Sequence, residues 1–127
     1  MLIMLKDSKL KRRFNNEEIH RKDFETFERD KRGWIICPTG DYTAIEVFPE
    51  NCKFGDGCYF GDGHDFGNEC IFGGRCSFGS ECYFDDGCHF GEQCKFGKKC
   101  KFGDGNLFDN ECTIGAGSTF GKDNKFG

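Results

Sequence analysis

Thirteen consecutive six-residue units of the form C-x-F-G-x-x, the last cut short, run from Cys52 to the final residue of this 127-residue chain. The third position is Phe in every unit except one, which has Ile114, and the first position is Cys in nine units. The other units carry His64, Asn106, Ser118 and Asn124 at the first position. A strict period over more than half of the chain predicts a structure built by repetition.

The alternation of side chains along a strand decides which positions of the unit form a core. Positions one and three point to one face and position two to the other, so Cys and Phe should point inward. No unit can bury its Phe alone, so successive short strands must coil and stack into a solenoid. Position four is Gly except at Asp85 and Asp109. Because Gly and Asp tolerate a left-handed backbone, we expect position four to form the corner.

These residues resemble the hexapeptide-repeat family, whose units carry an aliphatic residue, a small residue two positions before it and often Gly after it. The resemblance covers residues 52–127, and it extends toward Glu46 because Tyr42 and Phe48 fall in phase with the Phe column. It implies an all-β solenoid, a left-handed parallel β-helix with three hexapeptides per coil, in which residues eighteen apart stack directly.

The segment before the repeat differs in composition, and we expect residues 1–45 to form a small α+β cap on a solenoid of residues 46–127. Asn16 as N-cap and Gly33 as terminating residue predict a helix over residues 16–32. Residues 34–37 and 42–48 are predicted strands on either side of a turn. The basic run at residues 9–13 is either a solvated face or a contact with phosphate or an acidic partner.

Nine of the ten cysteines occupy the first position of the unit, where a small inward side chain is needed. Stacking every eighteenth residue predicts the columns Cys52, Cys70, Cys88; Cys58, Cys76, Cys94, Cys112; and Cys82, Cys100. Neighbours in a column lie about one strand spacing apart, ~4.8 Å, so disulfides are geometrically possible. We expect reduced, buried thiols instead. The spacing contains no C-x-x-C pair, so we predict neither a metal site nor a cofactor.

The formal net charge is −4 and no apolar run is long enough to span a membrane, so we expect a soluble, cytoplasmic protein. Outward positions repeat no single residue type, which excludes an ordered Thr array for ice binding. Carboxylates repeat along the predicted corners, and a rigid row of negative charge can imitate a nucleic-acid backbone. The predicted partner-binding residues are Asp56, Asp62, Asp65, Glu69, Glu81, Asp85, Asp86 and Glu92.

This pattern favours a non-catalytic protein that binds a macromolecule, for example an inhibitor from a phage or mobile element acting on a nucleic-acid-handling complex. The simpler explanation of the pattern is that corners use turn-forming Asp, Asn and Gly. A scaffolding role is a further alternative. The resemblance also implies a third, an acyl-CoA-dependent acyltransferase with a His as general base. His64 and His89 are the histidines of the repeat, but no inserted loop accompanies them, so we predict no enzyme activity.

The repeat continues to the last residue, which leaves the final coil without a capping segment in this sequence. Uncovered solenoid ends expose unpaired backbone groups and apolar side chains. We therefore expect a homodimer formed end to end, with Phe120, Lys125 and Phe126 at the interface.

Overall fold

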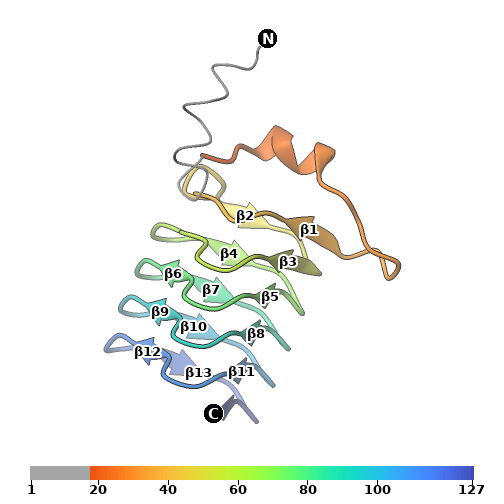
Figure 1. The fold of residues 1–127 in the computed structure, drawn as a ribbon. Coiled ribbons are helices and arrows are strands. Elements are labelled where there is room, and N and C mark those ends of the chain that lie inside the picture. Colours follow the sequence, from red (N-terminus) through yellow and green to blue (C-terminus); the bar gives the residue numbers. More distant parts are fainter. Residues whose placement is uncertain (1–17) are drawn as a thin grey trace.

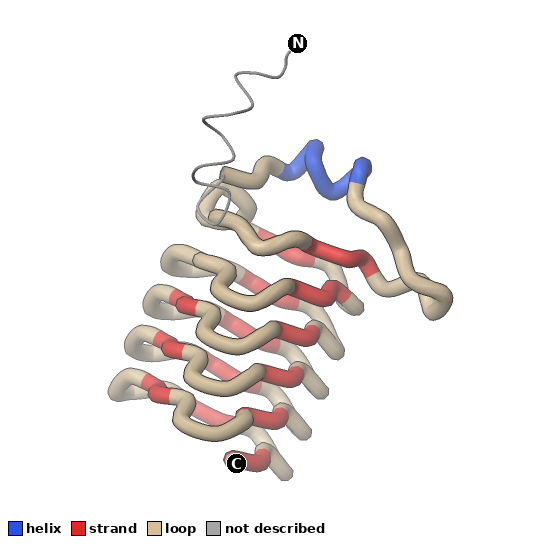
Figure 2. Tube along the Cα trace, viewed as in Figure 1, coloured by secondary structure: helices blue, strands red, loops and turns tan. Residues whose placement is uncertain are grey.

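The computed structural model describes residues 18–127, which form a stack of coils built from three parallel sheets (Figure 1). The first sheet contains, in spatial order, β1 (Ile35–Cys37), β3 (Cys52–Phe54), β5 (Ile71–Phe72), β8 (His89–Phe90), β11 (Leu107–Phe108) and β14 (Lys125–Phe126). The second contains β13 (Thr119–Phe120), β10 (Lys101–Phe102), β7 (Tyr83–Phe84), β4 (Asp65–Phe66) and β2 (Val47–Phe48). The third contains β12 (Thr113–Ile114), β9 (Lys95–Phe96) and β6 (Ser77–Phe78). Figure 2 shows how short these strands are and how much of each coil is loop. The predicted all-β solenoid is confirmed.

The register of the strands follows the repeat. Lys53 pairs with Ile71, and Ile71 with His89, so residues eighteen apart lie side by side and each coil contains three hexapeptides. The same offset holds in the other two sheets. Tyr59 continues the third sheet through an isolated bridge to Ser77. The predicted columns of inward and outward side chains are therefore confirmed.

The core consists of stacked phenylalanine rings. Within each sheet the rings of neighbouring coils lie parallel, as in Phe66 and Phe84, whose centroids are 4.8 Å apart with an interplanar angle of 4°. Rings from different sheets meet edge to face, as in Phe84 and Phe90 at 5.0 Å and 87°. The column of the third sheet begins with Tyr42, whose ring stacks on that of Phe60, as its phase in the repeat predicts. Edge-to-face and parallel contacts together fill most of the triangular interior, and His64 and Asn106 are the polar side chains buried beside the rings within the described residues.

Within each corner the left-handed backbone lies at position six, not at position four as the sequence predicts. All twelve residues at position six have positive φ, between 57° and 78°. They are Gly57, Gly63, Glu69, Arg75, Glu81, Gly87, Gln93, Lys99, Gly105, Glu111, Gly117 and Asp123. Position four is Gly for a different reason, because neighbouring coils approach closely there. A Cβ built on Gly91 would lie 2.7 Å from the carbonyl carbon of Gly73, and one on Gly115 would lie 2.5 Å from the carbonyl oxygen of Gly97.

The predicted helix over residues 16–32 is wrong in extent and type for the residues that the structure describes. The helix is a 3₁₀ segment, η2 (Arg21–Thr26), which begins after His20 and ends at Phe27. Gly33 terminates no helix. It closes a tight turn with φ of 87°, and its N–H donates to the Asp30 carbonyl oxygen at 2.9 Å. The predicted N-cap Asn16 and the basic run at residues 9–13 lie outside the described residues.

Backbone pairing with other segments accounts for the short helix. The N–H of Ile19 donates to the Asp41 carbonyl oxygen at 2.7 Å, and that of Ile36 to the Glu28 carbonyl oxygen at 2.8 Å. The described residues on either side of η2 therefore pair with other segments and do not continue the helix. The strand expected over residues 34–37 appears as β1, whereas that expected over residues 42–48 shrinks to β2. In residues 18–127 no helix is long and apolar enough to cross a membrane.

Segment η2 covers the first coil, at the upper end of the stack in Figure 1. The Phe24 ring lies 6.2 Å from that of Tyr42 and 6.1 Å from that of Phe48, so it closes the aromatic core. Strand β1 pairs with β3 at an offset of seventeen, which sets Cys37 opposite Phe54 in place of a ring. Strand pairing between coils thus begins at β1, which precedes residue 46, the expected first residue of the solenoid.

Candidate binding surface

Acceptor side chains at position five connect the coils. The backbone N–H of Gly74 donates to Asp56 Oδ1 at 2.9 Å, and that of Ser80 to Asp62 Oδ1 at 2.8 Å. The same bond links Asn68, Asp86, Asp104 and Lys122 in succession, at 3.1, 2.8 and 2.8 Å. Each of these side chains satisfies a backbone donor of the next coil. Such carboxylates therefore have a structural role whatever else they do, in line with the turn-forming explanation of the pattern.

The eight carboxylates predicted to bind a partner do not lie on one surface. The solenoid has three corners, one after each sheet, and the eight side chains are distributed over all of them. The corner after the first sheet contains Asp56 and Glu92, that after the third contains Asp62 and Glu81, and that after the second contains Glu69, Asp85 and Asp86. Asp65 lies on β4, just before the last of these corners. Position five thus forms a ladder at each corner, and the eight predicted residues are divided among the three corners.

The corner after the second sheet has the most negative charge, and we call it the acidic edge. It consists of Glu50, Glu69, Asp85, Asp86, Asp104 and Asp123, with Lys122 as its one cation. All of these side chains are exposed except Asp85, which is half-buried. The corner after the third sheet, by comparison, balances Asp62 and Glu81 with Lys98 and Lys99. Glu50, Asp104 and Asp123 are not among the predicted partner-binding residues, although counting in steps of eighteen from Asn68 and Gly105 finds all three.

The inward position one selects hydrogen-bond donors as well as small side chains. The Cys94 thiol donates to the Gly73 carbonyl oxygen, Sγ to O 3.3 Å, and Cys112 to that of Gly91 at 3.2 Å. Five further thiols make the same contact, and Asn124 Nδ2 repeats it to Gly103 at 3.0 Å. Of the residues that replace Cys, Asn124 and Ser118 donate a side-chain hydrogen bond to a backbone carbonyl oxygen, whereas the buried Nδ2 of Asn106 and Nδ1 of His64 have no partner among the described residues.

All ten cysteines are free thiols, and all but Cys112 are buried, as predicted. In the column of the third sheet, the hydrogen bond to the Cys58 thiol raises the pKa of Cys76 to about 12, and burial acts in the same direction. The hydrogen bond to Cys76 and burial likewise raise the pKa of Cys94. In residues 18–127 no group of three or more Cys, His, Asp or Glu side chains is placed to hold a metal ion.

Shared S–H hydrogen bonds move the pKa values in the other columns in opposite directions. Side-chain hydrogen bonding with Cys52 and Cys88 lowers the pKa of Cys70. Hydrogen bonding with Cys37 and Cys70 raises the pKa of Cys52, and hydrogen bonding with Cys70 raises that of Cys88. Hydrogen bonding with Cys82 lowers the pKa of Cys100 to about 7. The pKa shifts within each of these columns therefore differ in sign.

The two histidines of the repeat occupy different environments. His64 is buried, with 2% of its surface exposed, and lies in the core 5.8 Å from the Phe48 ring, centroid to centroid. Its inward position was predicted from the repeat. His89 points outward on β8 between Ile71 and Leu107, with its side chain exposed. The two imidazoles thus lie on opposite sides of the coil wall and do not share a site.

The residues predicted for an oligomer interface lie in the last two strands, β13 and β14. Phe120 is 39% exposed and Phe126 57% exposed, in contrast to the buried rings of the preceding coils. Within the described residues, β12, β13 and β14 are each the last strand of their sheet.

Comparisons with protein-family models, curated proteins and solved structures gave no match.

Proposed function

We propose that this protein is a non-catalytic β-solenoid whose acidic edge binds a cationic surface of a macromolecular partner. The observation that supports the proposal is the placement of six carboxylates and one lysine along a single corner of a rigid stack. The edge spans four coil steps, about 19 Å. Its six carboxylates and one lysine therefore give about one net negative charge per 4 Å, close to the 3.4 Å spacing of phosphates along one strand of B-form DNA. A cationic channel that accepts nucleic acid is therefore the proposed partner surface.

The structural bonds at position five support this role, because they hold the carboxylates in line. Asp86 and Asp104 each accept one backbone N–H of the ladder at Oδ1, which leaves the second oxygen for solvent or a partner. The partner we propose is a nucleic-acid-handling complex. The protein would inhibit that complex as a nucleic-acid mimic encoded by a phage or mobile element.

The resemblance to hexapeptide-repeat left-handed β-helices remains part of the proposal, supported by the period of six and the eighteen-residue register.

Charge reversal at position six tests the edge without disturbing the ladder. Lys99 shows that a lysine can adopt the required positive φ, so Glu69→Lys/Asp123→Lys should fold normally. We expect it to weaken binding to the partner at least about tenfold, since complementary charge governs such association. The matched control, Glu81→Lys/Glu111→Lys, makes the same change of charge at position six of the other two corners.

The measurement is affinity capture from a lysate, with duplex DNA as competitor. The expected result is recovery of nucleic-acid-binding proteins that DNA displaces, loss of capture in the edge variant and retention in the control. Equal capture by both variants, or capture that DNA leaves unchanged, would contradict the proposal.

We also propose that the last coil pairs end to end with a second copy of the chain. The exposed rings of Phe120 and Phe126 lie beside the unpaired strand edges and the ammonium of Lys125, so a two-fold contact would cover both and close on itself. Light scattering should give a dimer at micromolar concentration, and Phe126→Lys should give a monomer with an unchanged circular dichroism spectrum. A monomeric wild-type protein would refute this interface.

A further inference from the structure

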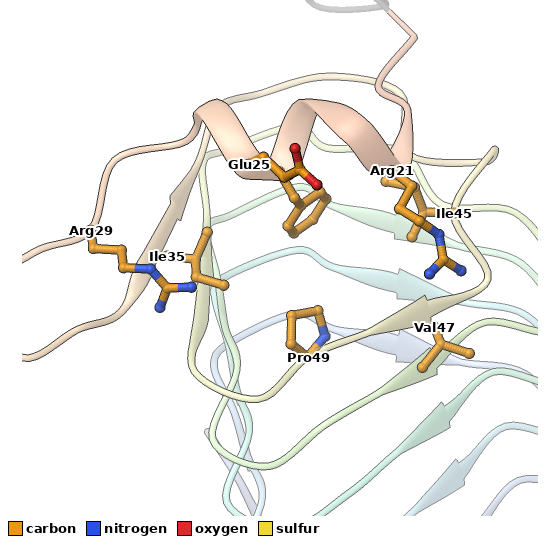
Figure 3. Close-up of a pocket in the computed structure, with 8 residues that line it drawn as sticks. Arg21, Glu25, Arg29, Ile35, Ile45, Val47 and Pro49 are labelled. Carbon is orange, nitrogen blue, oxygen red and sulfur yellow. The ribbon is translucent and has the colours of Figure 1, made fainter.

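A pocket of about 400 Å³ lies between segment η2 and the first coil (Figure 3). It forms because a six-residue 3₁₀ helix is too short to cover the whole end of the solenoid, and Phe24 closes only the part over Tyr42 and Phe48. The apolar lining consists of Phe24, Ile35, Ile45, Val47 and Pro49. Its size falls within the range of about 300 to 1,000 Å³ that is usual for small-molecule sites.

Two guanidinium groups flank this apolar floor. Figure 3 shows Arg21 and Arg29 on opposite sides of the pocket, with both side chains directed toward it. Arg29 donates one N–H, from Nη1, to the Gly33 carbonyl oxygen at 2.9 Å, which orients its guanidinium and leaves its other donors for a ligand. Among the described residues, Arg21 takes part in no ion pair. The Glu25 carboxylate also lies at the rim, between the two arginines in Figure 3, and among the described residues it forms no ion pair with either of them.

An apolar floor with two cationic groups at its rim is complementary to an amphipathic anion. Guanidinium binds carboxylate through paired N–H donors, and burial of an alkyl or aromatic tail supplies the remaining affinity. We propose that the pocket binds a small carboxylate with an apolar tail, such as a medium-chain fatty acid. This site is independent of the acidic edge, whose carboxylates would repel the same ligand.

The proposal can be tested by calorimetric titration of the full chain with decanoate. Decanol and decyltrimethylammonium, which have the same tail with a neutral or a cationic head, are the ligand controls. We expect decanoate to bind most tightly, and Arg21→Gln to weaken its binding at least about tenfold while leaving decanol unchanged. The matched control is Arg75→Gln, which removes an exposed arginine from a corner outside the pocket.

A second variant keeps the test independent of any effect of Arg21 on folding. Val47 is 58% exposed, so Val47→Asp should be tolerated, and it places a carboxylate in the pocket wall. It should abolish decanoate binding and leave decyltrimethylammonium binding intact. Equal binding of all three ligands, no binding of decanoate at millimolar concentration, or the same loss in Arg75→Gln would overturn the proposal. Glu69→Lys/Asp123→Lys should leave decanoate binding unchanged, which separates this site from the proposed function.

Discussion

Phe84→Ala should lower the free energy of unfolding by about 3–5 kcal/mol, the usual cost of truncating a fully buried phenylalanine. The ring is 0% exposed and lies between Phe66 and Phe102 in its own column, at 4.8 and 5.0 Å. Four more rings from the other two columns contact it edge to face. Truncation would remove all six contacts and leave a cavity that neighbouring coils, fixed by their backbone ladder, cannot fill.

The change is large relative to the stability of a domain this size, ~5–15 kcal/mol. Urea unfolding followed by far-ultraviolet circular dichroism measures it. The matched control is Tyr83→Ala, the preceding residue on β7, which points outward and is 43% exposed. It should cost less than about 1 kcal/mol, as is usual for surface positions. Similar losses for the two variants would show that the inward column does not carry the stability of the fold.

The inward and outward faces were predictable from the sequence because they depend on a local rule. Strand alternation and a period of six place Phe84 inside and Tyr83 outside, and three units per coil set the register. The corner was not predictable in the same way. Its glycines at position four avoid clashes with the next coil, eighteen residues away, while residues such as Glu69 and Lys99 adopt the positive φ that they usually avoid. Stacking of the coils overrides the preference of single residues there.

The N-terminal cap was predicted less well because its helix signals competed with tertiary pairing. Lys31, Arg32 and Gly33 are typical of a helix end, but Asp30 organises a turn instead. Its Oδ1 accepts the N–H groups of Arg32 and Trp34, and its Oδ2 pairs with Lys53 Nζ at 2.8 Å. That bond also lowers the pKa of the Asp30 carboxyl. The lysine lies one coil away, and nothing in the local sequence reveals it.

The candidate surface shows the same division between local and distant information. Counting in steps of eighteen identifies the stack of Asn68, Asp86 and Asp104, which the hydrogen bonds confirm. The same count places Asp56 and Asp62 on the two other corners, because neither lies a multiple of eighteen residues from Asp86. The count does not show that these side chains accept backbone N–H groups of the next coil, which depends on the stacking of the coils. The acidic edge therefore occupies one corner and contains fewer carboxylates than the predicted set of eight. Its density of negative charge is higher than that of the other two corners.

The thiol column of the third sheet predicts loss of stability in alkali. Cys76 and Cys94 have a raised pKa in the folded state, about 12 for Cys76, whereas an unfolded thiol ionises near 8.5 to 9. Below pH 8.5 both states hold the proton, so the contribution of these thiols is fully present there. Above pH 9 only the unfolded chain releases its protons, and the contribution is lost progressively up to the folded pKa. Each thiol then lowers the free energy of unfolding by about 1.4 kcal/mol per pH unit, or about 3 kcal/mol for the two.

This slope can be measured by urea unfolding between pH 8 and 10 in a phosphine reductant. Tyr42, whose pKa burial also raises, begins to contribute near pH 10, but equally in the wild type and in each variant. Cys76→Ala/Cys94→Ala should be less stable at pH 7 but should lose about 3 kcal/mol less per pH unit above pH 9. The control is Ser118→Ala, which removes the acceptor of the Cys100 N–H at 3.1 Å and lowers stability without removing a thiol, so its slope should match the wild type. If the cysteine variant keeps the wild-type slope, the buried column ionises as readily as the unfolded chain, and the donor role of position one in the repeat would have to be abandoned.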